Sequence, residues 1–360
     1  MSVTLTDYGN VSVNTIAQSS VSFNPSLFSV TAWTPNEIDL SVNSSSGAHV
    51  LKLTGQFDLA SVGSTPGTLA DFINDTALGT VSSFTNYVNG ALGFTENFGS
   101  ISFSDLLSLL GANGTSAQST ALNSVFSGND VYHTSNDASG TNSVTVNLYG
   151  GNNTFYENHP LLQSHDVFYG GSNTGINTVV LPGNASNYLI TANPAYDAYT
   201  GTSVLSGYTI TDKTGATNTL DVSQVERLQF ADTKVALDVN GNAGEVAKIL
   251  GAVFGPSSIQ SHPDYVGLGL KYLDGGMSYA DLSALALTAA GATTPQAIVN
   301  LLYTHVVGVA PTATQAAPFI QDLTSNQFSV GNLAVMAENT SLNTTHINLV
   351  GLEQTGIHYV

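Results

Sequence analysis

Length, composition and charge already exclude several kinds of protein. The chain has 360 residues, more than one hydrophobic core usually serves, so we expect two or three domains. Only 9% of its residues are charged, against about 25% in an average soluble protein. Six Lys and Arg against 25 Asp and Glu give a net charge of −19, which disfavours nucleic acid and anionic membranes and favours divalent cations.

Cysteine and apolar runs set two further limits. The chain has no cysteine, which excludes disulfides, thiolate metal sites and a cysteine nucleophile. No stretch approaches the roughly 20 apolar residues of a membrane span. Met1 to Asp7 lack the basic region and apolar run of a cleavable secretory signal, so an exported protein would need a signal elsewhere in the chain.

The first 118 residues predict a β-rich domain. β-Branched and aromatic residues gather between Ser, Asn, Gly and Pro, as in short strands. The predicted strands are 11–16, 27–33, 49–59 and 81–88. Short helices are expected at 68–76, at 104–110 with Ser104 as its cap, and at 117–126.

Residues 119–239 change to short strands between Gly and Asn turns, and residues 240–360 change again to a helical period. Strands are predicted at 143–149, 206–212 and 228–237. Amphipathic helices are predicted at 243–254, 265–273, 279–289, 295–307, 317–323 and 330–337. The fold class is therefore multidomain α+β: a β-rich N-terminal domain, a β-roll-like middle segment and an all-α C-terminal domain.

The middle segment repeats a triplet of Asp or Asn, then Val or Thr, then a large apolar residue. It begins at Asp130, Asn153, Asp166 and Asn177, and glycine-rich turns lie beside it. Stacked turns of this kind present carbonyl and carboxylate oxygens to one hard cation, and Ca²⁺ takes 6–8 such oxygens. The predicted Ca²⁺ ligands are Gly128, Asp130, Gly150, Asn152, Asn153, Asp166, Gly170, Asn173 and Asn177.

These turns resemble the glycine- and aspartate-rich nonapeptide of the repeats-in-toxin family, the unit of a calcium-loaded parallel β-roll. The triplets are 23, 13 and 11 residues apart rather than about nine, and two of the four begin with Asn. An amide oxygen replaces a carboxylate there, which lowers the expected affinity. The alternative is that these are ordinary Asn/Gly turns with cross-strand packing and no metal.

The resemblance continues beyond the turns. Residues 225–232, Val-Glu-Arg-Leu-Gln-Phe-Ala-Asp, look like the segment that closes such regions in exported bacterial proteins. Residues 241–244 and 273–279 look like the helical domain of unknown function that often follows. The family implies export by a type I system that reads a C-terminal signal, and residues 349–360 are a candidate for it, or else a final strand or helix that docks on the core.

Histidines and carboxylates suggest two rival functions. His133, His159 and His165, with a nearby Tyr, could bind zinc or haem, as in a secreted ligand-capture protein of the hemophore type. Paired carboxylates such as Asp130 and Asp137 could serve a glycosidase or lyase. The sequence has no HExxH, GxSxG or phosphate-binding loop, so we expect no enzyme.

The sequence thus predicts a secreted, calcium-associated structural or adhesive protein. We expect it to form a homo-oligomer or polymer, such as a surface layer, matrix or extracellular filament. Exposed edges of β-rich domains with few charges invite lateral self-association, which Ca²⁺ could gate. Cell-surface polysaccharide is a further candidate partner.

Overall fold

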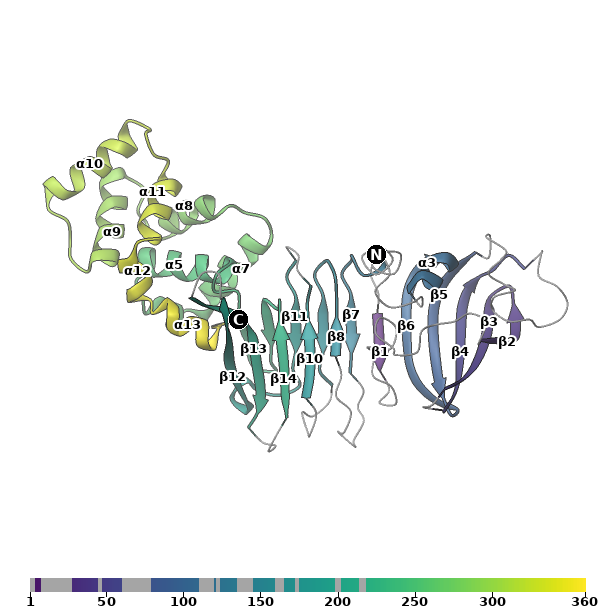
Figure 1. Cartoon of the computed structure of the whole chain (residues 1–360). Helices are drawn as coiled ribbons and strands as arrows, with labels where there is room; N and C mark the ends of the chain where they lie inside the picture. Colours follow the sequence, from purple (N-terminus) through teal and green to yellow (C-terminus); the bar gives the residue numbers. More distant parts are fainter. Residues whose placement is uncertain are drawn as a thin grey trace. The chain divides into compact units, whose positions relative to one another are not determined.

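A computed structural model describes residues 4–7, 28–44, 47–59, 79–109, 120, 124–134, 145–158, 165–171, 175–197, 202–213 and 218–360 (Figure 1). The predicted strand at 11–16 and the predicted helix at 68–76 lie outside them, as does the boundary predicted at 118/119. The chain forms two compact units. The first comprises Met1–Leu189 and Asn193–Val225, and the second comprises Ile190–Ala192 and Glu226–Val360. Strands and helices both occur, which confirms the mixed α+β class.

The first unit begins with an antiparallel sheet. Its strands are β2 (Ser29–Thr34), β3 (Glu37–Ser44), β4 (Gly47–Gln56), β5 (Thr80–Val88) and β6 (Ala91–Ser102), each paired with the next. Alternate residues are buried, among them Ile38, Leu53 and Phe84. Asn89 and Gly90 both have positive φ, as a two-residue hairpin between β5 and β6 requires.

Helix α3 (Phe103–Leu109) follows β6 directly. The sequence predicted Ser104 as its cap, but Ser102 takes that role: its Oγ accepts a hydrogen bond of 3.0 Å from the backbone N–H of Asp105. Phe103, Leu106 and Leu109 of α3 are buried, and the ring of Phe103 meets that of Phe57 edge-on at 6.2 Å. The helix therefore closes one part of the apolar core.

Six short strands of the first unit form two parallel sets. Strands β7 (Val131–His133), β9 (Thr154–Tyr156) and β11 (Thr178–Val180) lie side by side in one sheet. Strands β8 (Thr145–Asn147), β10 (His165–Tyr169) and β14 (Thr219–Ser223) lie side by side in another. From β7 to β11 the chain alternates between the sheets, and β14 later joins the second (Figure 1). We call these six strands and their connections the coil.

Flanking strands extend both sheets of the coil. Strand β1 (Thr4–Asp7) pairs parallel with β7 and antiparallel with β6, so the antiparallel sheet and the first sheet of the coil are continuous. Strand β13 (Thr202–Asp212) pairs antiparallel with β14, and β12 (Tyr188–Asp197) is next in that sheet. At its other end the second sheet stops at β8.

Aromatic side chains fill the interior of the coil. The rings of Tyr132 and Phe155 stack with centroids 5.2 Å apart and planes 6° apart. Phe155 also contacts Phe168 of the second sheet, at 4.8 Å between centroids. All three residues are buried, so the two sheets pack on one another through this row.

The second unit combines a small antiparallel sheet with helices. Strands β15 (Arg227–Gln229), β16 (Lys234–Ala236) and β17 (Ile357–Tyr359) pair in that order. The predicted single strand at 228–237 is thus wrong: the N–H of Phe230 bonds to the carbonyl of Thr233 and turns the chain into a hairpin. The predicted all-α domain from residue 240 also contains a strand, β17.

Helices α5 to α13 complete the second unit. Their bounds are α5 (Asn242–Phe254), α6 (Ser258–Ser261), α7 (Pro263–Asp274), α8 (Tyr279–Ala289), α9 (Pro295–Val307), α10 (Ala313–Thr324), α11 (Val330–Glu338), α12 (Ser341–His346) and α13 (Leu349–Thr355). The predictions for α8 and α9 are confirmed residue for residue. Five of the helices begin at a Ser or Thr whose side chain accepts a backbone N–H of the first turn, namely α8 to α12.

A buried arginine, Arg227, connects residues 225–232 with residues 273–279, two of the segments that resemble the family. The Arg227 side chain is only 5% exposed; its Nη1 donates to Asp238, and its Nη2 donates to both carboxylate oxygens of Asp274 at 2.8 and 2.9 Å. Asn242 at the start of α5 donates to the same Asp274 at 2.8 Å. Burial lowers the pKa of the Arg227 guanidinium, but the charges of Asp238 and Asp274 outweigh this and leave it raised.

Arg227→Ala should destabilise the second unit by about 3–5 kcal/mol, because it leaves Asp238 and Asp274 without their cation in a largely buried position. The loss is measured by urea unfolding followed through the helical circular dichroism signal. Lys271→Ala is the matched control: it removes one cation from an exposed position on α7 and should change stability by less than about 0.5 kcal/mol. Equal losses in the two variants would contradict the role given to Arg227.

Candidate functional site

Seven of the nine predicted calcium ligands lie at one end of the coil. Gly128 and Asp130 precede β7, Gly150, Asn152 and Asn153 precede β9, and Asn177 precedes β11, whereas Gly170 follows β10. Because the two sheets run in opposite directions, strand starts in the first sheet and strand ends in the second share this end. We call it the asparagine end. Asn173 lies outside the described residues.

Side-chain amides stack at the asparagine end as a hydrogen-bonded ladder. The Asn153 Oδ1 accepts from the N–H of Asp130 at 3.0 Å, and the Asn177 Oδ1 accepts from the N–H of Asn153 at 3.1 Å. The amide nitrogens donate in turn, from Asn153 to the carbonyl of Gly170 at 3.1 Å and from Asn177 to that of Gln224 at 2.9 Å. The buried amides therefore stitch successive turns of the coil together and bind the two sheets to each other.

A second, outer row of the ladder uses neighbouring asparagines. The N–H of Asn152 donates to Asn129 Oδ1, and the N–H of Ile176 donates to Asn152 Oδ1, both at 2.8 Å. Glycine is needed beside this row: Gly151 has φ +76°, and a Cβ on it would lie 1.9 Å from the carbonyl oxygen of Gly128. The sequence singled out Asn152, Asn153 and Asn177 as metal ligands, and it did not foresee that backbone N–H groups donate to their amide oxygens.

Asp166 lies at the opposite end of the coil from the other predicted ligands. The triplet at Asp166 was predicted to be equivalent to the triplets at Asp130, Asn153 and Asn177, and this prediction is wrong. Strands β7, β9 and β11, which begin at residues 131, 154 and 178, stack in the first sheet, whereas Asp166 begins the buried face of β10 in the second. One full turn of the coil takes 23 or 24 residues, so the spacings of 13 and 11 on either side of Asp166 are half turns.

Buried polar side chains surround Asp166 at this opposite end, which we call the carboxylate end. The rings of Phe155 and Phe168 contact each other across the coil. Glu157 is the next buried residue after Phe155, and Asp166 is the last buried residue before Phe168. Because β9 and β10 belong to different sheets and run in opposite directions, the two carboxylates lie at the same end of the coil, one on each sheet. Each is about 2% exposed.

Two further oxygens complete the carboxylate end. Thr134 Oγ1, which follows β7, donates to Glu157 Oε1 at 2.9 Å. Thr219 pairs with His165 in the register of β14 and β10, so the preceding Asn218 lies at the same end as Asp166. Asn218 is 1% exposed, and its Oδ1 has no hydrogen-bond partner in the described part of the chain. The predicted calcium ligands did not include Glu157, Thr134 or Asn218, although the alternation Phe155-Tyr-Glu157 marks Glu157 as inward-facing.

A second carboxyl pair lies beside the asparagine end. Glu96 of β6 and Asp130 are both buried, and β1 runs between their strands. Burial and, to a smaller extent, the charge of Asp130 together raise the pKa of Glu96 to about 8. Glu96 therefore carries a proton at neutral pH, which makes burial without a cation tolerable.

His133 and His165, the two described histidines of the rival ligand-capture function, do not share a site. His133 lies on the outer face of β7, stacked on Tyr156 at 4.5 Å, and burial lowers its pKa. His165 lies on the outer face of β10, where Nε2 is 3.2 Å from Asp221 and Nδ1 is 2.6 Å from Thr219. These faces belong to different sheets, and His159 lies outside the described residues.

Within the described ranges, no three His, Cys, Asp or Glu side chains come together as a metal-binding group. No helix of those ranges is long and apolar enough to cross a membrane. Comparisons with family models, with curated proteins and with solved structures gave no match.

Asn153→Asp should destabilise the first unit by about 1–3 kcal/mol or more, since it keeps the acceptor for Asp130 but places a buried carboxylate against the carbonyl of Gly170. Unfolding of this unit is followed by the fluorescence of Trp33, the single tryptophan of the chain. The exposed neighbour is the control: Asn152→Asp keeps its acceptor role and should change stability by less than about 0.5 kcal/mol. Stabilisation of Asn153→Asp by calcium would instead favour metal ligands at the asparagine end.

The stability of the first unit should fall as pH rises from about 4.5 to about 8. Over this interval Glu96 keeps its proton in the folded state but has released it in the unfolded state. The free energy of unfolding therefore falls as pH rises. Urea unfolding at several pH values, read by Trp33 fluorescence, measures the slope. Glu96→Gln should flatten it, and a slope that the substitution leaves unchanged would show that Glu96 is not the group responsible.

Proposed function

We propose that this chain is an exported structural or adhesive protein whose coil is a degenerate β-roll of the repeats-in-toxin type, stabilised by calcium and able to assemble with further copies. The observation that carries the proposal is the carboxylate end. Glu157 and Asp166 are buried at this end on different sheets, Thr134 donates to Glu157, and the buried Asn218 lies at the same end. An all-oxygen set with two carboxylates suits Ca²⁺ better than a transition metal.

The scarcity of basic residues supports a bound cation. Of the six Lys and Arg in the chain, only Lys52 and Lys213 belong to the first unit. Lys52 bonds Glu37 and Asp39 on the antiparallel sheet, and Lys213 donates to the carbonyl of Ser186. A bound cation would offset the burial of the Glu157 and Asp166 carboxylates, and the Oδ1 of Asn218, which has no hydrogen-bond partner in the described part of the chain, offers an additional ligand.

Exposed sheet edges support assembly. Strand β2 ends the order of the first sheet, and β8 ends that of the second. Neither strand contains a charged residue or a proline, the usual devices that prevent edge-to-edge pairing. Strand β2 exposes Ser29, Thr31 and Ala32 and could pair with an edge of another copy.

Calcium should raise the stability of the first unit, by about 2.7 kcal/mol when its free concentration is 100 times the dissociation constant. The measurement is Trp33-monitored urea unfolding with calcium and with chelator. Combining Glu157→Gln with Asp166→Asn should abolish the calcium effect, while Asp130→Asn at the asparagine end should preserve it. If calcium does not stabilise the wild type, the proposed site is contradicted. If only Asp130→Asn abolishes the stabilisation by calcium, the site lies at the asparagine end instead.

Assembly should depend on the β2 edge. In millimolar calcium, light scattering of the wild type should show oligomers, and Ala32→Lys should reduce them because a lysine on an edge strand opposes pairing. Ala48→Lys is the matched control, since Ala48 is equally exposed but lies on β4, between β3 and β5. A wild-type protein that stays a monodisperse monomer with and without calcium would contradict the assembly proposal.

A further inference from the structure

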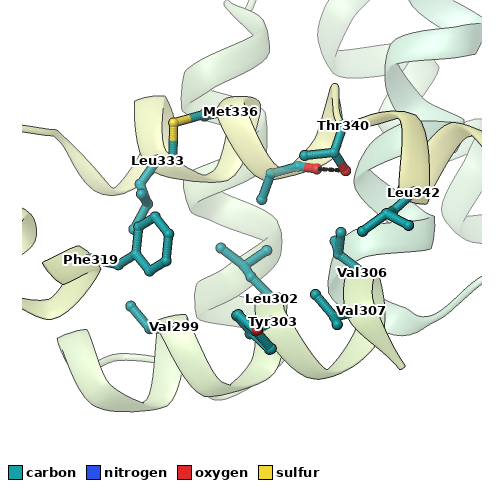
Figure 2. Close-up of a pocket in the computed structure, with 11 residues that line it drawn as sticks. Val299, Leu302, Tyr303, Val306, Val307, Phe319, Leu333, Met336, Thr340 and Leu342 are labelled. Carbon is teal, nitrogen blue, oxygen red and sulfur yellow. Dashed lines mark hydrogen bonds between the residues drawn. The ribbon is translucent and has the colours of Figure 1, made fainter. Parts of the chain in front are cut away.

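The second unit contains an apolar pocket unrelated to the coil. Its volume is about 410 Å³, and it lies between α9, α10, α11 and α12 (Figure 2). Leu302 and Leu333 form its inner wall, with the ring of Phe319 at one side. The volume falls within the 300–1,000 Å³ range of small-molecule sites.

Large apolar side chains at the mouth remain exposed to water. Met336 is 44% exposed, Leu342 is 49% exposed and Val307 is 38% exposed, and all three line the pocket. The hydroxyl of Thr340 also lines it but already donates to the carbonyl of Ala337 at 2.8 Å. A hollow with an apolar interior and an apolar rim is favourable for a hydrocarbon group that removes these side chains from water.

Charge narrows the class of ligand. None of the four surrounding helices carries a Lys or Arg; their carboxyl residues are Asp322 and Glu338, and their histidines are His305 and His346. Glu338 is buried and accepts a 2.8 Å hydrogen bond from Ser283. A fatty-acid carboxylate or a phospholipid phosphate would find no Lys or Arg on these helices, so the electrostatics select against anionic amphiphiles.

We propose that this pocket binds an uncharged, hydrocarbon-rich small molecule of the fatty-alcohol type, with the alkyl chain between Leu302 and Leu333 and the polar end at the mouth. The binding energy comes from burial of the alkyl chain and of the exposed rim. This role is independent of the coil and of calcium.

The test uses the full chain with ¹³C-methyl-labelled methionine, because Met1, Met277 and Met336 are the only methionines. Titration with 1-decanol should shift the methyl signal of Met336 saturably and leave that of Met277 in place. Decanoate, of the same chain length but charged, should bind roughly tenfold more weakly. The absence of a Met336 shift with 1-decanol, or equal affinity for decanoate, would overturn the proposal.

Matched leucine variants locate the site. Leu342→Glu places a charge at the mouth, in the first turn of α12 where an acid is tolerated, and should weaken 1-decanol binding roughly tenfold or more. Leu285→Glu makes the same change on α8, at a leucine that is 41% exposed and outside the pocket, and should leave binding unchanged. Val307→Lys, at the end of α9, provides a second mouth variant. Equal effects of Leu342→Glu and Leu285→Glu, or retained affinity in both mouth variants, would exclude this pocket.

Discussion

Everything in the first unit depends on how successive turns of the coil are held in register. Three parallel strands of three residues make few backbone hydrogen bonds, so the side chains must supply the rest. The buried amides of Asn153 and Asn177 do this, since each accepts from the turn before it and donates to the opposite sheet. The rings of Tyr132 and Phe155, which are paired residues of β7 and β9, stack on each other inside the coil and support the same register. A chain with few charges can fold in this way because amides and rings stack without the repulsion that stacked carboxylates would suffer.

The two ends of the coil solve the problem of polar burial differently. At the asparagine end, neutral amides satisfy backbone groups, and the neighbouring Glu96 stays protonated. At the carboxylate end, Glu157 and Asp166 are buried on different sheets, and we propose that a divalent cation neutralises them. The apolar pocket of the second unit is lined by no charged residue, and its exposed Met336 and Leu342 favour a hydrocarbon ligand.

Much of the fold could be predicted from the sequence, because local signals and packing agree. Pro295 and Gly308 bracket α9, Ser278 caps α8, and the alternation near Val146 marks β8. The site was only partly predictable. The triplets look alike, but whether Asp166 stacks on Asn153 or faces away depends on the length of one turn of the coil, a long-range property that no local pattern contains. Likewise Arg227 and Asp274 are 47 residues apart, and only the fold brings them together.

The central claim is that a hard cation is bound between the sheets at the carboxylate end. Tyr156 directly precedes Glu157 in the chain, so a tyrosine lies beside the proposed site and can act as a sensitiser. Terbium, a luminescent ion of similar size and ligand preference to calcium, tests the claim directly. The account predicts tyrosine-sensitised terbium emission that excess calcium displaces and that Glu157→Gln with Asp166→Asn removes. Emission that is absent, or that survives both substitutions, would contradict it.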